Sequence, residues 1–130
     1  PYISMTTAMM ADWGCDVSVH PPPRSGYDVA DRNVSSAPTE YAIEPDASAA
    51  SYFWAAAAVG GRVTVRGLTR KSLQGDVAFV DVLQQMGCRV EESDAGITVH
   101  GGPLKGVDVD MSAISDTVMT LAAVALFADG

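Results

Sequence analysis

Basic residues, cysteines and histidines are scarce in this sequence of 130 residues. Eight Lys and Arg residues stand against sixteen Asp and Glu residues, which gives a formal net charge of −8. This balance argues against binding to nucleic acid or to an anionic membrane surface. The two histidines have no cysteine or histidine partners at metal-ligand spacing. No GxGxxG or P-loop motif is present. We therefore expect neither a metal site nor a cofactor.

Cysteine is limited to Cys15 and Cys88, too few for a disulfide framework. Each follows a glycine at the end of a predicted helix. We expect both to be buried free thiols in a protein of the reducing cytoplasm.

The sequence also lacks an apolar run of the ~20 residues that a transmembrane helix needs. Its longest such stretch is residues 46–61, DASAASYFWAAAAVGG. Alanine is the best helix former, Asp46 is a good N-cap, and Gly60 or Gly61 can supply a left-handed residue that ends a helix. Because the stretch is apolar nearly all round, it predicts a helix buried on every side, around which strands and other helices must pack.

Periodicity and turn residues predict the remaining elements. Helices are expected at residues 2–13 and 76–86, with a second interior helix at 115–128. Strands are expected at 15–20, 39–43, 62–68, 88–92, 97–100 and 107–111. Residues 21–27 are expected to be a loop, and residues 28–38 remain either loop or edge strand.

Two features recur along the chain. Trp13-Gly14-Cys15 in MADWGCDVSV returns as Met86-Gly87-Cys88 in LQQMGCRVEE, 73 positions later, and the Asp that begins each interior helix recurs 70 positions later. Repeats at a fixed spacing indicate units that share a core. The fold class we predict is therefore α/β (α+β), built from repeated βαβαββ units with helices inside and sheets outside.

Four segments, in this order and spacing, resemble one family. They are PYISMTTAMMADWG, IEPDASAASYFWAAAA, KSLQGDVAFVDVLQQMG and VDVDMSAISDTVMTLAAVALFADG. Together they resemble the middle of 5-enolpyruvylshikimate-3-phosphate (EPSP) synthases, over nearly the whole chain and least in residues 21–39.

The resemblance implies a two-lobed enzyme of which this chain is about a third. Residues 1–43 would end the first lobe, residues 44–46 would cross between lobes, and residues 46–130 would begin the second. The family transfers the enolpyruvyl group of phosphoenolpyruvate to the 5-hydroxyl of shikimate 3-phosphate. Its N-terminal lysine and C-terminal glutamate and arginine residues would lie outside this chain, so we expect no turnover by this chain alone.

Asp116, in ISDTVMT, matches the family's active-site aspartate, although Ser115 stands where proline is common. The resemblance implies that Asp116 binds the shikimate ring hydroxyls and removes the 5-hydroxyl proton. The residue pattern alone favours an N-cap, and one side chain can do both. Tyr2 matches the family's KPY tyrosine, which contacts shikimate 3-phosphate, and the alternative is an aromatic residue at a helix start.

Glu44 and Asp46 are expected to be hinge and capping residues rather than substrate contacts. Gln74, Gly75 and Asp76 open a predicted helix, where an anion could bind. The carboxylate of Asp76 would repel a phosphate, so we expect it to cap that helix instead.

Two other kinds of protein fit the same sequence. One is a non-catalytic module of this fold that self-associates or binds a complementary fragment. The other is an intact binding protein with a borrowed fold. Because a partial lobe leaves apolar surface uncovered, we expect a homodimer or larger assembly.

Overall fold

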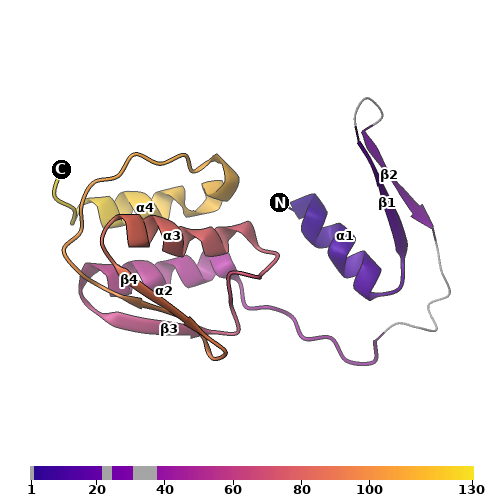
Figure 1. The fold of residues 1–130 in the computed structure, drawn as a ribbon, viewed down its shortest axis with the longest axis horizontal. Coiled ribbons are helices and arrows are strands. Elements are labelled where there is room, and N and C mark those ends of the chain that lie inside the picture. The colour runs from indigo at the N-terminus through magenta and orange to yellow at the C-terminus, as the bar shows by residue number, and fades with distance from the viewer. Residues whose placement is uncertain (1, 22–24, 31–37) are drawn as a thin grey trace. The chain divides into compact units, whose positions relative to one another are not determined.

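The computed structural model describes residues 2–21, 25–30 and 38–130. The chain divides into two compact units, Pro1–Ile43 and Glu44–Gly130, and each is described by itself (Figure 1). Within the described residues, no helix is both long enough and apolar enough to cross a membrane.

The described part of unit 1 contains a helix followed by a pair of antiparallel strands. Helix α1 spans Tyr2–Asp12, and strands β1 (Asp16–His20) and β2 (Gly26–Ala30) pair antiparallel. This confirms the predicted helix and first strand. The loop expected at residues 21–27 is wrong at Gly26 and Tyr27, which pair in β2 with His20 and Val19. Of the alternatives for residues 28–38, a strand is found at residues 28–30, while residues 22–24 and 31–37 lie outside the described part. No described residue of this unit is buried.

Residues 39–43 form no strand, so that prediction is wrong. A strand needs a partner to accept and donate its backbone hydrogen bonds, and neither described sheet includes this segment. Its apolar residues therefore belong to a connection, in which Ile43 is 86% exposed.

Helix α2, Ala47–Gly60, is the Ala-rich stretch. Its buried side chains are Ala47, Ala50, Ser51, Trp54, Ala55, Ala57 and Ala58. Burial on every side is wrong, however, because Tyr52 is 64% exposed and Phe53 is 58% exposed. The apolar pattern of a helix indicates that other elements can cover it, but it does not show that those elements lie within these 130 residues. The left-handed end is also wrong, since Gly61 is extended (φ −154°) and donates its N–H to Ala57.

The second sheet has three antiparallel strands in the order β3-β5-β4. They are β3 (Arg62–Arg66), β4 (Arg89–Ser93) and β5 (Gly96–His100). Helix α2 packs against β3 and β5. Between β3 and β4 lie the short helix η2 (Gly75–Ala78) and helix α3 (Phe79–Gln85). These elements confirm the predicted strand–helix–strand–strand order.

The C-terminal part departs most from expectation. Residues 107–111 form no strand, although Val107, Val109 and Met111 do alternate inward and pack against the core. The predicted helix at 115–128 is instead η3 (Ser112–Thr117) followed by α4 (Val118–Ala125). Only Thr120 and Val124 are buried in α4, so it is not an interior helix in this chain.

The sequence repeat appears as one backbone motif made twice. At the end of α1, the N–H of Cys15 donates to Met10 O (2.9 Å) and the N–H of Gly14 to Ala11 O (2.9 Å). At the end of α3, the bonds recur between residues 73 positions further on, Cys88 to Leu83 and Gly87 to Gln84 (3.0 and 3.1 Å). This is the Schellman cap, which requires a left-handed residue, and both glycines have positive φ.

Candidate functional site

Three helical segments begin at the same end of unit 2, where the chain enters it (Figure 1). They are α2, η2 with α3, and η3 with α4. The contacts agree with the view, since η2 packs against the start of α2 and against η3. Helix N-termini carry positive partial charge and unpaired N–H groups. Here that charge is already compensated, because Asp46 accepts from the N–H of Ala49 and the carboxylate of Asp76 lies beside Ser48 at the start of α2.

Asp116 lies in η3 at this end of the unit, and its side chain is exposed. Its neighbours Ile114 and Thr117 are buried, and Thr117 donates its hydroxyl to Ile114 O at 2.8 Å. Ile114 has non-helical φ/ψ (−133°, 43°), which separates the first turn from α4. The N-cap of α4 is Thr117, not Asp116. The structure thus sets the exposed Asp116 between two buried residues, one position before the N-cap of α4.

Asp46 holds the N-cap position of α2, with its Oδ1 accepting from the N–H of Ala49 at 3.0 Å. The cap of η2 differs from the prediction. Gln74, not Asp76, is its N-cap residue, and it makes no side-chain cap bond to that helix. Asp76 instead accepts a short hydrogen bond from the hydroxyl of Ser48. The expected capping role of Asp76 is therefore wrong, and its carboxylate connects η2 to the first turn of α2.

Glu44 is bound to the turn that precedes η2. Its Oε2 accepts from the hydroxyl of Ser72 (2.6 Å) and from Nε2 of Gln74 (3.1 Å). Glu44, Asp46 and Asp116 therefore all belong to unit 2. Tyr2 belongs to unit 1, where it is the first residue of α1 and 65% exposed. Its carbonyl oxygen accepts from the hydroxyl of Thr6 at 3.0 Å.

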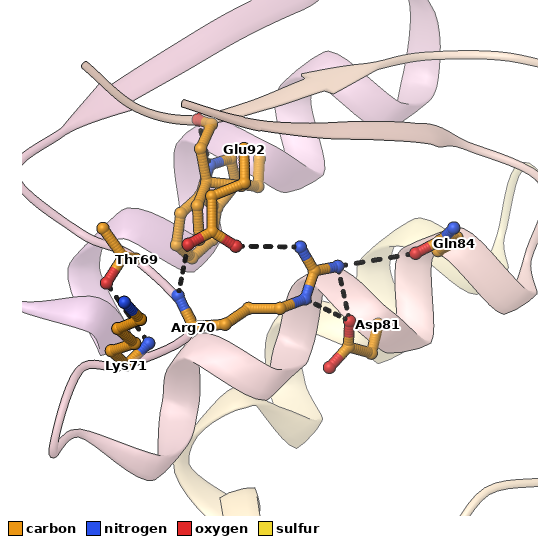
Figure 2. Close-up of polar contacts among 8 residues, drawn as sticks. Thr69, Arg70, Lys71, Asp81, Gln84 and Glu92 are labelled. Atoms are coloured by element: carbon orange, nitrogen blue, oxygen red, sulfur yellow. Dashed lines mark hydrogen bonds and ion pairs between the residues drawn. The ribbon is translucent and has the colours of Figure 1, made fainter. Parts of the chain in front are cut away.

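Arg70 forms a cluster that the sequence analysis missed (Figure 2). Its Nη2 donates to Asp81 Oδ1 at 2.7 Å and to Gln84 Oε1 at 3.4 Å, and its Nη1 donates to Glu92 Oε2 at 3.3 Å. The hydrogen bond to Asp81 is the main reason that the pKa of Arg70 is raised above its ordinary value, against desolvation. A guanidinium engaged by two carboxylates holds the loop after β3 to α3 and β4, rather than serving an anionic ligand.

The described residues contain no group of three or more His, Cys, Asp or Glu side chains placed to hold a metal ion. Both cysteines are free, with Cys88 buried as expected and Cys15 only half-buried. Burial raises the pKa of the Cys88 thiol, which disfavours the nucleophilic thiolate.

Comparison with known proteins places the whole chain. Residues 1–130 match the family described as EPSP synthase (3-phosphoshikimate 1-carboxyvinyltransferase). The 3-phosphoshikimate 1-carboxyvinyltransferase of Psychromonas ingrahamii is 45% identical over 131 residues, which cover 100% of this chain and 30% of that protein. That of Nostoc punctiforme is 48% identical over 129 residues, which cover 98% of this chain and 30% of that protein. This chain thus spans about a third of the length of these relatives.

A solved structure shares the fold. The enolpyruvyl transferase NikO from Streptomyces tendae superimposes with a TM-score of 0.68 at 23% identity, covering 100% of this chain and 32% of that one. At this identity the likeness supports the predicted enolpyruvyl-transferase-like fold alone. Because the family match extends over all of residues 1–130, this chain belongs to the EPSP synthase family.

Proposed function

We propose that this chain is a segment of an enzyme that transfers the enolpyruvyl group of phosphoenolpyruvate to the 5-hydroxyl of shikimate 3-phosphate, with release of phosphate. The observation that carries the proposal is the family match over residues 1–130. On this proposal residues 1–43 end one lobe, residues 44–46 cross over, and residues 46–130 begin the other lobe. The division of the chain between Ile43 and Glu44 supports this assignment.

Asp116 is the general base on this proposal. Its exposed carboxylate lies in η3, at the end of unit 2 where the helical segments begin (Figure 1). The carboxylate would hydrogen bond the ring hydroxyls and accept the 5-hydroxyl proton as the oxygen adds to the enol carbon of phosphoenolpyruvate, while a separate acid protonates the methylene carbon. The tetrahedral adduct then loses phosphate and a methyl proton, which restores the double bond. General bases of this kind contribute about 10²–10⁴-fold to a rate.

Tyr2 is a substrate-binding residue on this proposal, with its phenol hydrogen bonded to shikimate 3-phosphate.

On the same proposal the chain by itself is inactive, because binding two multiply charged anions needs several cations. This chain has a net charge of −8, and Arg70 is engaged by Asp81 and Glu92. We expect the purified chain to release no phosphate when it is mixed with both substrates.

A chimaera tests the assignment directly. The 130 residues would replace the matching segment of the Psychromonas ingrahamii enzyme, and phosphate release would be followed with both substrates. We expect an active enzyme in which Asp116→Asn lowers kcat by at least ~100-fold, while Tyr2→Phe mainly raises KM for shikimate 3-phosphate. Asp94→Asn, an exposed aspartate in the β4–β5 turn, is the matched control. A folded but inactive chimaera, or full activity of Asp116→Asn, would contradict the proposal.

Self-association of the chain by itself is a second proposal. Helices α2 and α4 pack side by side, and both expose apolar side chains, including Phe53 (58%) and Met119 (79%). Exposed apolar surface of this kind favours association. Light scattering at rising concentration is expected to show a dimer or larger species. The double substitution Phe53→Ser and Met119→Ser is expected to shift the chain toward monomer.

The cytoplasmic location expected from the free cysteines stays a prediction.

A further inference from the structure

Gln74 holds the segment that leads into α2 with both ends of its amide. Its Nε2 donates to the carbonyl oxygen of Pro45 (2.7 Å) and to Glu44 Oε2 (3.1 Å). Its Oε1 accepts from the N–H of Ala47 at 2.8 Å. The hydroxyl of Ser72 adds a second bond to Glu44 at 2.6 Å. We call these five residues, Glu44, Pro45, Ala47, Ser72 and Gln74, the Gln74 clamp.

Gly67, the residue that follows β3, packs against the same segment. A Cβ on Gly67 would lie 3.0 Å from Cγ of Pro45, so the proline ring packs directly against this glycine. At the second residue of α2, the hydroxyl of Ser48 donates a hydrogen bond to Asp76. Residues from Glu44 onward are therefore fixed to unit 2 by several independent contacts.

The residues just before the clamp are attached elsewhere. Tyr41 donates its hydroxyl to Asp12 Oδ2 at 3.1 Å, and its ring lies 5.8 Å from that of Trp13, so it belongs to unit 1. Between the two attachments stand only Ala42 and Ile43. Both are exposed, Ile43 to 86%.

We propose that the Gln74 clamp fixes the start of unit 2, so that any change in orientation between the two units is confined to Ala42 and Ile43. Glu44 is then an anchor of unit 2 and not the hinge that its position in the sequence predicts. The Gln74-Gly75-Asp76 segment acquires a role that is independent of substrate. All of these contacts lie within one unit or the other, and none of them involves a substrate.

Backbone dynamics of the ¹⁵N-labelled full chain test this proposal. The heteronuclear NOE is expected to fall to a minimum at Ala42 and Ile43 and to return to a rigid value at Glu44. The amide of Ala47 is expected to be protected from hydrogen exchange. A Glu44 amide as mobile as those of Ala42 and Ile43 would overturn the proposal.

Two substitutions at Gln74 test the roles of its amide oxygen and its amide nitrogen separately. Gln74→Ala removes the acceptor of the Ala47 N–H, and exchange at Ala47 is expected to rise by about twofold to tenfold, the range for one hydrogen bond. Gln74→Glu keeps that acceptor but replaces the donor with a carboxylate facing Glu44. It is therefore expected to leave Ala47 protected and to extend the mobile region through Glu44.

Gln85→Ala is the matched control, because Gln85 is an exposed glutamine near the end of α3. If Gln74→Ala does not fold, Gln74→Glu still decides the question. If the Glu44 amide is no more mobile in Gln74→Glu than in the Gln85→Ala control, the proposal is overturned.

Discussion

The segments α1–β1–β2 and α3–β4–β5 have the same local construction and very different burial. Both helices end in a Schellman cap made at equivalent positions, and each cap leads into the first strand of an antiparallel hairpin. Yet α1 contains no buried residue, whereas α3 buries Phe79, Val80, Val82 and Leu83. Leu83 is fully buried, and its equivalent Met10 is only half-buried.

The difference comes from two further elements of unit 2. Helix α2 packs against α3, β3 and β5, and β3 pairs with β5 as a third strand. Unit 1 has no second helix or third strand among its described residues. Local sequence signals thus determine caps and hairpins, while the stability of the unit depends on which elements cover them.

The largest expected effect comes from truncating the two equivalent side chains. Leu83→Ala should lower the free energy of unfolding of unit 2 by about 2–5 kcal/mol, the usual loss for a buried leucine. Met10→Ala should cost unit 1 no more than about 1 kcal/mol, because the side chain is only half-buried. The chain has two tryptophans, Trp13 in unit 1 and Trp54 in unit 2. Their indole NMR signals in urea report the unfolding of each unit separately. Equal losses of unfolding free energy in the two units would contradict the comparison.

A smaller effect is expected at the cap of α2. Asp46→Ala removes the hydrogen bond to Ala49 and should destabilise unit 2 by about 1 kcal/mol. The Trp54 signal in urea should shift while the Trp13 signal stays unchanged. Asp94→Ala, at an exposed turn, is the control. A shift of the Trp13 signal as large as that of Trp54 would mean that the units do not unfold separately.

The smallest effect concerns pH. A hydrogen bond from His100, followed by the charge of Arg89, lowers the pKa of Glu91 below its ordinary value of 4.5. A lowered folded-state pKa means that the stabilisation is present above pH 4.5 and is lost as pH falls through the folded pKa. Glu91→Gln should therefore make the acid loss of stability slightly less steep, as measured by urea midpoints between pH 7 and pH 3. A steeper loss in the variant would show that the sign is wrong.

The sequence predicted those parts that depend on local signals. The capping aspartate of α2, the two Gly-Cys helix ends and the alternation in β3 are all carried by adjacent residues. Contacts that join distant segments were not predictable, and the Arg70 cluster is one, because its partners are 11 and 22 positions away. The strand predicted at residues 107–111 was wrong for the same reason, because an alternating pattern does not show which strand would pair with it. At the candidate site, the irregular Ile114 turn that delays α4 past Asp116 left no sequence signal.

The most direct test of this account is native-state hydrogen exchange at the two equivalent cysteine amides. Cys15 and Cys88 donate to Met10 and Leu83 in the same cap, at 2.9 and 3.0 Å, so the bonds themselves do not distinguish them. If covering elements set stability, Cys88 should exchange at least ~100-fold more slowly than Cys15, because opening it requires unit 2 to unfold. Equal protection at the two amides would contradict the account.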